Sequence, residues 1–344
     1  MAKQAVLLLA HGTPETVEQI PEYLRNVTGG RPLPLAVVEE IQRRYALIGH
    51  SPLTEITQEQ GRLVEAELAA AGEPVPVYIA MRNWSPYIAD VVRQMRADGM
   101  EAAAVLCLAP QNSRTSVGLY RRAVEAEAGD LRIDFTDAWA QHPLLIEAFA
   151  ERLRPAWTRL SAEVGAPVPV LFTAHSVPCR TIQAPADSAD GQGGDPYAEE
   201  AKRTAALVAA SVPGISQWYF AFQSQGASGG PGSNVTWLGP TVEATLEALA
   251  ASGVKTLMLQ PIGFLCDHVE ILYDVDILFR EVAAKLGMRL ERPESLNASV
   301  TLARAIADLA WQGLARLRSQ QSLAQRHSQS EGPVQTPGGS AIFG

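Results

Sequence analysis

Two histidines in this chain follow the same kind of apolar segment. Residues 6–14 read VLLLAHGTP and residues 170–178 read VLFTAHSVP, so His11 and His175 each end a run with the length of a β-strand. In an open α/β sheet, ligands bind at the carboxyl ends of such strands. A strand that ends in a small-residue turn is common, so this repeat alone leaves chance and duplication open. If the halves are related, both imidazoles are predicted to face whatever lies between them.

Acidic residues follow a third apolar run that ends at Pro261. Residues 263–276 read GFLCDHVEILYDVD, and in a helix Asp267, Glu270 and Asp274 would share one face. Such a face is often only solvated, but its place after a buried strand and opposite His175 favours function. An imidazole with a carboxylate suits a borderline metal such as Fe²⁺ or Zn²⁺. A site that releases its metal needs few protein ligands and open positions, which His175 and Glu270 satisfy.

A second pair of phrases supports duplication. Residues 104–110 read AVLCLAP and residues 256–261 read TLMLQP, and each follows a helix-like stretch closed by a glycine turn. Strand-like runs alternate with longer amphipathic segments along most of the chain, which predicts α/β architecture with parallel sheets and helices on both faces. We expect one domain over residues 1–150 and another over 151–318, with packing of the last helix back on the first domain left open. Residues 319–344 are polar and aperiodic, which predicts a disordered tail.

Composition narrows the class of protein. With 344 residues and 47% hydrophobic content, the chain can bury a large core in two domains. A formal net charge of −9 argues against a nucleic-acid partner. No run of 18 apolar residues predicts a membrane span, and the N-terminus lacks a signal pattern. Cys107, Cys179 and Cys266 lie far apart, which suits a reducing cytoplasm and argues against a disulfide framework.

The motifs together resemble the ferrochelatase family. They lie in the family's order from about residue 5 to residue 315 and comprise GTP at 12–14, IGHSPL at 48–53, AHSVP at 174–178, GDPY at 194–197, QSQG at 223–226, WLGP at 237–240 and PIGF at 261–264, continuing to Asp274. The resemblance implies two Rossmann-like domains with a porphyrin cleft between them. It also implies insertion of Fe²⁺ into a tetrapyrrole in haem synthesis.

The resemblance assigns roles to several residues. His175 corresponds to the family's metal-site histidine and Glu270 to its carboxylate partner, which would accept protons as the porphyrin loses two pyrrole N–H protons. Asp267 and Asp274 are candidates for relaying protons or metal. Iron is a substrate, and we expect no permanently bound cofactor. We also expect no [2Fe–2S] cluster, because no cysteine follows Cys266.

The resemblance is strongest to the soluble branch that uses coproporphyrin III, a porphyrin with four propionates. The interval between Pro14 and Ser51 is short and is not markedly apolar, unlike the lip of membrane-associated members. By position, the residues that match the lining of the porphyrin and its propionates in that branch are Arg44, Tyr45, Ser51 and Tyr120. An arginine pairs with a carboxylate through two hydrogen bonds, and hydroxyls donate to it.

Two departures from that branch bear on the substrate. His11 stands where that branch usually has a tyrosine, and this tyrosine can be an axial ligand of the iron in the product complex. Histidine can also bind iron. Thr28 and Gly29 stand where a basic pair is expected, with Arg31 nearby.

Several alternatives stay open at this stage. Protoporphyrin IX is the second choice of substrate. His11 with His175 keeps open a cobalt or nickel chelatase for another tetrapyrrole, whereas retention of Glu270 disfavours a haem or porphyrin carrier. The expected partners are the porphyrin and Fe²⁺, without nucleic acid or a membrane span, and a monomer is compatible with the sequence.

Overall fold

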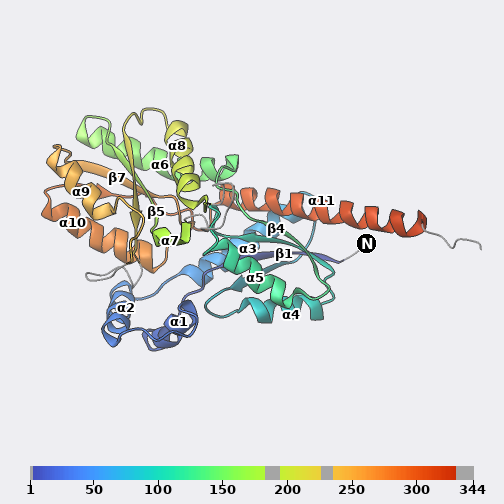
Figure 1. Cartoon of the computed structure of the whole chain (residues 1–344). Coiled ribbons are helices and arrows are strands. Elements are labelled where there is room, and N and C mark those ends of the chain that lie inside the picture. The colour runs from blue at the N-terminus through green and yellow to red at the C-terminus, as the bar shows by residue number, and fades with distance from the viewer. Residues whose placement is uncertain (1–2, 183–193, 226–234, 331–344) are drawn as a thin grey trace, which may run out of the picture.

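Two parallel sheets of four strands form the framework of the protein (Figure 1). The computed structural model describes residues 3–182, 194–225 and 235–330. The first sheet has the order β2-β1-β3-β4 and the second has the equivalent order β6-β5-β7-β8. The strands are β1 (Gln4–Ala10), β2 (Val77–Met81), β3 (Ala102–Cys107), β4 (Arg132–Thr136), β5 (Val170–His175), β6 (Trp218–Gln223), β7 (Thr256–Pro261) and β8 (Arg289–Glu291). The predicted α/β class, with two Rossmann-like sheets, is confirmed.

The shared strand order places a topological switch point in each sheet. Strand β1 lies between β2 and β3, and β5 lies between β6 and β7. In each sheet the second strand in sequence is therefore added on one side of the first strand, and the third strand on the other side. Ligands bind outside the carboxyl ends of strands at such a point. His11 follows β1 and His175 ends β5. The two histidines therefore occupy equivalent positions in related sheets.

The central strands of the first sheet, β1 and β3, are buried on both faces because nearly all of their residues are apolar. Val6 and Leu8 of β1 face one core cluster, whereas Leu7 and Leu9 face another, as the two-residue period of a strand requires. Helix α3 contributes to the first cluster, and α4 and α5 contribute to the second. The helical segments of this half are η1 (Val17–Gln19), α1 (Ile20–Val27), α2 (Leu35–Ile48), α3 (Leu53–Ala70), α4 (Ile88–Ala97) and α5 (Val117–Ala128).

The second sheet is covered in the same way. Val170 and Phe172 of β5 pack among residues of α6 and α8, whereas Leu171 packs among residues of α9, η3 and α10. The helical segments of this half are α6 (Pro143–Val164), α7 (Cys179–Ile182), α8 (Tyr197–Ser211), α9 (Val242–Ala251), the π-helix η3 (Glu270–Phe279) and α10 (Arg280–Lys285). Helix α11 (Val300–Ser330) follows β8 and returns along the first sheet (Figure 1).

The packing of α6 and α11 changes the predicted domain limits. Residue 150 lies inside α6, which packs on α8 and β7, so the second domain begins before residue 143. Helix α11 packs on β3, β4 and α3 of the first domain and also on α6. One hydrophobic cluster therefore contains Leu8 of the first sheet, Phe172 of the second and Leu302 of α11.

The predicted disordered tail is wrong over residues 319–330, which continue α11 as a helix. This stretch has four glutamines, which favour helix, and it holds no Gly or Pro that would end the helix before Gly332. Arg318 Nη1 lies 3.0 Å from Glu73 Oε2, and Arg132 Nη2 donates to Gln321 Oε1 at 3.2 Å, which anchors this part of the helix on the first domain. The rest of the predicted tail, 331–344, lies outside the described residues.

Candidate active site

A cavity of about 300 Å³ lies where the carboxyl ends of the two sheets meet. Residues of both halves line it, which is the arrangement expected from the two switch points. Six of the residues singled out in the sequence are among them, namely His11, Tyr45, Ser51, Tyr120, His175 and Glu270. Arg44, Asp267 and Asp274 are not part of the lining. Sequence reasoning thus found part of the polar wall, and other polar lining residues, such as Arg82, Gln111 and His268, were not selected.

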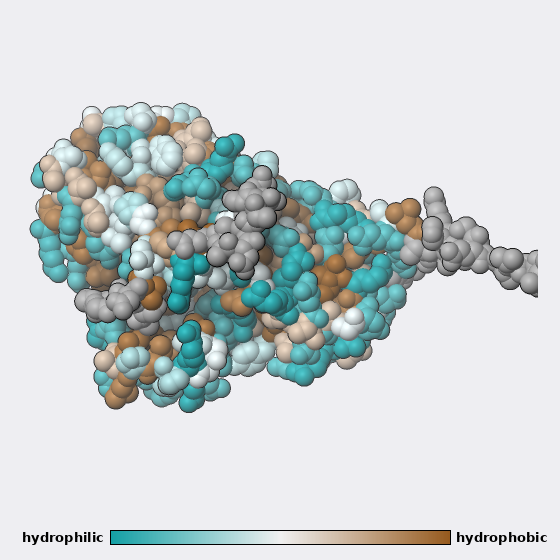
Figure 2. All heavy atoms as spheres, viewed as in Figure 1, coloured by the Kyte–Doolittle hydropathy of each residue, from teal (hydrophilic) through white to brown (hydrophobic). Residues whose placement is uncertain are grey.

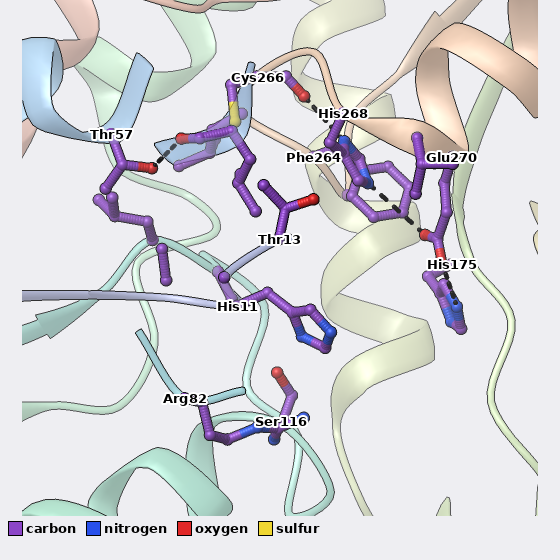
Figure 3. A pocket seen from close by; sticks show the side chains of 18 of the residues that line it. His11, Thr13, Thr57, Arg82, Ser116, His175, Phe264, Cys266, His268 and Glu270 are labelled. Carbon is purple, nitrogen blue, oxygen red and sulfur yellow. Dashed lines mark hydrogen bonds and ion pairs between the residues drawn. The ribbon is translucent and has the colours of Figure 1, made fainter. Parts of the chain in front are cut away.

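The side chains of His175 and Glu270 lie next to each other in the cavity wall and point toward one another (Figure 3). His175 Nε2 lies 3.4 Å from Glu270 Oε1, and both side chains are about one-third exposed. The hydroxyl of Tyr197 donates to the carbonyl of His175 at 2.8 Å and fixes the end of β5. Gly263 after β7 is required here, because a Cβ at this position would lie 2.9 Å from the Cβ of Ala174. The close approach of β5 and β7 brings the histidine and the acid together.

Each partner of this pair stabilises the charged form of the other. Burial alone would lower the pKa of His175, but the carboxylate of Glu270 outweighs it and the pKa of His175 is raised. Burial would raise the pKa of Glu270, but His175 and His268 hold the pKa well below its usual range. The electrostatics of the pair therefore favour an imidazolium beside a carboxylate. A metal ion that binds His175 must displace a proton.

His268 is a third member of this group that the sequence analysis did not select. Its Nε2 lies 3.6 Å from Glu270 Oε2, and its Nδ1 lies 3.0 Å from the carbonyl oxygen of Cys266 (Figure 3). The sequence analysis considered a helix that already includes residue 267. In such a helix His268 would point away from Glu270, so this histidine was not selected. In the structure η3 begins at Glu270, and residue 268 lies in the turn before it. A histidine two residues before a candidate acid was the available signal.

Asp274 lies one turn along η3 and contacts the first domain. Its side chain is 5% exposed, its Oδ1 lies 3.3 Å from Arg44 Nη1, and its Oδ2 accepts a hydrogen bond from the hydroxyl of Ser224. Burial and the nearby Glu270 raise the pKa of Asp274 to about 6, against the opposing effects of Ser224 and Arg44. This carboxyl can therefore change protonation close to neutral pH.

The structure does not bring Asp267 to this group, which corrects the expectation that it shares a face with Glu270. Its Oδ1 accepts from Arg292 at 3.1 Å and from Ser295 at 2.7 Å, and its Oδ2 accepts from the Asn297 side chain at 2.9 Å. Because the helix starts three residues later than expected, Asp267 belongs to the preceding turn. Its carboxylate joins that turn to residues 292–297.

We expect Asp267→Ala to destabilise the fold more than it affects turnover. Removing one partner of a buried, hydrogen-bonded ion pair costs about 3 kcal/mol, since Arg292 is left without one of its two acidic neighbours. Urea unfolding should show this loss, whereas kcat of the folded variant should stay within about threefold of wild type. A large fall in kcat with unchanged stability would restore Asp267 to the relay.

His11 supplies the polar group of the opposite half. Gly12, with φ of +85°, allows the turn after β1, because a Cβ there would lie 2.9 Å from the backbone nitrogen of Trp84. The Asn83 side-chain nitrogen lies 3.1 Å from His11 Nε2, and the ring of Tyr23 packs edge-on at 6.2 Å. Burial, with a smaller contribution from Arg82, lowers the pKa of His11 to about 3. Its imidazole is neutral at physiological pH.

Three hydroxyl residues predicted to bind the substrate line the same wall. The hydroxyl of Tyr45 lies 3.0 Å from that of Thr13, and burial raises the pKa of Tyr45 to about 12. Ser51 is 1% exposed, and its hydroxyl has no protein partner among the described residues. The ring of Tyr120 lies under the guanidinium of Arg82 at 5.0 Å. All three side chains keep a proton to donate at neutral pH.

Arg44 does not point into the cavity, which differs from its expected place on the porphyrin. Its Nε donates to Glu40 at 2.9 Å, its Nη1 contacts Asp274, and its guanidinium lies 4.8 Å from the centre of the Tyr273 ring. Neighbouring acids thus satisfy this arginine in the structure. The sequence could not show that choice of partner, because Asp274 lies 230 residues away.

The lip formed by α1 and α2 is more apolar than expected. Val27, Leu35 and Leu47 are 38%, 71% and 54% exposed. Figure 2 shows apolar atoms gathered at the lower left, where Figure 1 places these helices. Among the helices in the described ranges, none is long and apolar enough to cross a membrane.

Comparison with known proteins identifies the family. The model of the ferrochelatase family matches residues 3–314. A ferrochelatase of Acidobacterium capsulatum is 58% identical over 326 residues, which cover 93% of this chain and 97% of that protein. The chain belongs to the ferrochelatase family. A ferrochelatase of Deinococcus radiodurans is 40% identical over 85% of this chain and 90% of its own length.

Membership of the ferrochelatase family confirms several sequence predictions. The protein is a metal-inserting enzyme of haem biosynthesis whose substrates are a porphyrin and iron. A coproporphyrin III ferrochelatase of Mycolicibacterium vanbaalenii is 36% identical over 90% of this chain and 89% of its own length. A sirohydrochlorin chelatase of Bacillus subtilis subspecies spizizenii, solved with cobalt, aligns with a TM-score of 0.52 over 92% of this chain and 98% of that chain. At 11% identity, that likeness shows the fold alone.

Proposed function

We propose that this ferrochelatase inserts Fe²⁺ into coproporphyrin III in the cavity between the sheets. The observation that carries the choice of porphyrin is the wall of proton donors around Ser51, whose buried hydroxyl has no acceptor among the described side chains and backbone. A buried donor without an acceptor costs about 1–3 kcal/mol, and a substrate carboxylate would remove that cost. Tyr45 and Tyr120 add two further phenols to this wall.

We assign the metal to His175 and the proton acceptance to Glu270. Fe²⁺ that binds His175 displaces its proton and leaves Glu270 as the charged neighbour. Insertion then removes two N–H protons from the porphyrin while the doubly charged ion leaves the pair. Two protons that arrive at His175 and Glu270 restore the charge that the iron takes away. The pair can therefore accept both protons without a change in the net charge of the buried site.

The next carboxyl along η3 offers a route for these protons. Asp274 lies four residues after Glu270, and its raised pKa of about 6 allows it to take up and release a proton near neutral pH. Ser224 donates to it and lies at the end of β6, beside this part of η3. We assign the relay to Asp274 without Asp267.

His11 is suited to contact the iron once it is in the ring. Its neutral imidazole carries a lone pair that iron could take in place of the Asn83 amide, which lies 3.1 Å from Nε2, and the residue belongs to the half opposite His175. The histidine would then act on the product complex, whereas His175 and Glu270 act before insertion.

The porphyrin preference tests the proposed substrate. Anaerobic assays with Fe²⁺ should give a kcat/KM for coproporphyrin III roughly 100-fold or more above that for protoporphyrin IX, because two vinyl groups would leave buried donors without acceptors. Ser51→Ala should reduce this ratio by removing one such donor. Protoporphyrin IX is the second candidate, favoured by the apolar lip at Val27, Leu35 and Leu47. Equal rates, or faster reaction of protoporphyrin IX, would reject the coproporphyrin assignment.

A further inference from the structure

Two polar atoms in the cavity wall have no hydrogen-bond partner among the residues that the structure describes. Over the described ranges, five buried side-chain nitrogen or oxygen atoms lack a hydrogen bond, and two of them, Ser51 Oγ and Arg82 Nη1, belong to residues that line this cavity. Buried polar groups in proteins are nearly always satisfied, so each exception calls for an explanation. Two such donors at one cavity point to a ligand that accepts hydrogen bonds.

Arg82 is held at this wall by its backbone and by Tyr120. It follows β2, its backbone N–H donates to the carbonyl of Ala10 at 3.0 Å, and its guanidinium lies 5.0 Å from the centre of the Tyr120 ring. Figure 3 shows Arg82 beyond His11, on the side of the cavity away from Glu270. The side chain is therefore fixed away from the metal pair, at another part of the wall.

The charge of Arg82 is not balanced by any described acidic residue. No carboxylate lies within 4 Å of its guanidinium in the described part of the chain, whereas Arg44 contacts Asp274 and Arg292 contacts two acids. Its neighbour His11 is neutral and provides no negative charge. A guanidinium stays charged, and a partly buried charge without a counter-ion is unfavourable. The site is thus prepared for an anion.

We propose that Arg82 binds a porphyrin carboxylate and discriminates coproporphyrin III from protoporphyrin IX. The inference rests on the proposed function, because it names the propionate that a vinyl replaces in protoporphyrin IX as the group that meets Arg82. The planar guanidinium can donate two parallel hydrogen bonds to that carboxylate. A vinyl group at the same place would leave the charge buried and unpaired, so the arginine disfavours protoporphyrin IX as well as attracting coproporphyrin III.

The test compares Arg82→Met with Arg82→Lys. The methionine keeps an unbranched apolar side chain without charge, and the lysine keeps a positive charge. Anaerobic kcat/KM is measured for coproporphyrin III and protoporphyrin IX with each variant and with wild type. We expect Arg82→Met to lower the value for coproporphyrin III by roughly 10- to 100-fold, mainly through KM, and to leave that for protoporphyrin IX unchanged or higher, because the charge that a vinyl leaves unpaired is gone. Arg82→Lys should retain much of the preference.

Controls separate this proposal from folding defects and from the proposed function. Arg62→Met removes an exposed arginine that pairs with Glu59 on α3, and should leave both values unchanged. If Arg82→Met does not fold, Arg82→Gln gives the same comparison. An unchanged value for coproporphyrin III, or an equal fall for both porphyrins, would overturn the role of Arg82. The wild-type ratio alone tests the proposed substrate, so the two failures can be told apart.

Discussion

Replacement of Glu270 by glutamine is expected to lower kcat for iron insertion by roughly 100- to 10,000-fold, the usual contribution of a positioned general base. Glutamine keeps the shape of the side chain but cannot take a proton from the porphyrin. It also removes the carboxylate that raises the pKa of His175, so burial would then lower that pKa. The variant should therefore bind iron without proton competition and still fail to turn over.

Steady-state kinetics at saturating Fe²⁺ separates these effects. Porphyrin affinity, followed by absorbance or fluorescence, should stay within about threefold of wild type, because Glu270 is assigned to proton acceptance. Glu281→Gln, on the exposed face of α10, is the matched control and should retain wild-type kcat. Near-normal turnover of Glu270→Gln at saturating iron would exclude Glu270 as the proton acceptor.

Removal of the imidazole in His175→Ala should lower kcat/KM for Fe²⁺ by more than about 100-fold. Loss of an outer partner of a metal ligand already costs about 10- to 100-fold, and His175 is assigned as a ligand itself. The pKa of His175 is raised, so the wild-type imidazole is protonated up to a higher pH than an ordinary histidine, and its protonated fraction grows as pH falls. Iron must then compete, and kcat/KM for Fe²⁺ should fall by up to about tenfold per pH unit below that pKa.

The pH profile distinguishes a ligand from a residue that only supports the fold. Kinetics from pH 5.5 to 8.5 (roughly the range where imidazole titrates) should show the acid fall in wild type and a flatter profile in His175→Ala. His50→Ala, at an exposed histidine paired with Glu55, should keep the wild-type profile. If His175→Ala retained both the affinity for iron and the acid fall, His175 would not be the metal ligand.

The central pair was predictable because its position follows from simple rules. Apolar runs gave the strands, and the carboxyl ends of parallel strands in related halves converge on one place. His175 and Glu270 each follow such a strand closely in sequence. The local chain therefore determines where they lie, and both belong to the second half, where the pairing of β5 with β7 brings them together.

Other residues were misplaced or missed because their partners are distant in sequence. Asp267 is held by residues 292–297, and Arg44 is held by Asp274 of the other half. The start of η3 at Glu270 also depends on packing that no local pattern shows. Arg82 belongs to no motif, and its significance is the lack of an acidic neighbour, which only the assembled cavity reveals. The end of α11 was missed because composition was weighed above helix propensity.

The return of α11 to the first sheet bears on how a flat substrate reaches the cavity. Residues of this helix and of α6 share one hydrophobic cluster with residues of both sheets, so the two halves cannot separate by a hinge motion without breaking that cluster. The width of the cavity between the halves is therefore fixed. Outside this interior, the pair α1–α2 borders the cavity, and its α2 meets η3 through Arg43 and Arg44 at Tyr273 and Asp274. Entry of a flat macrocycle, edge first, would then depend on this contact.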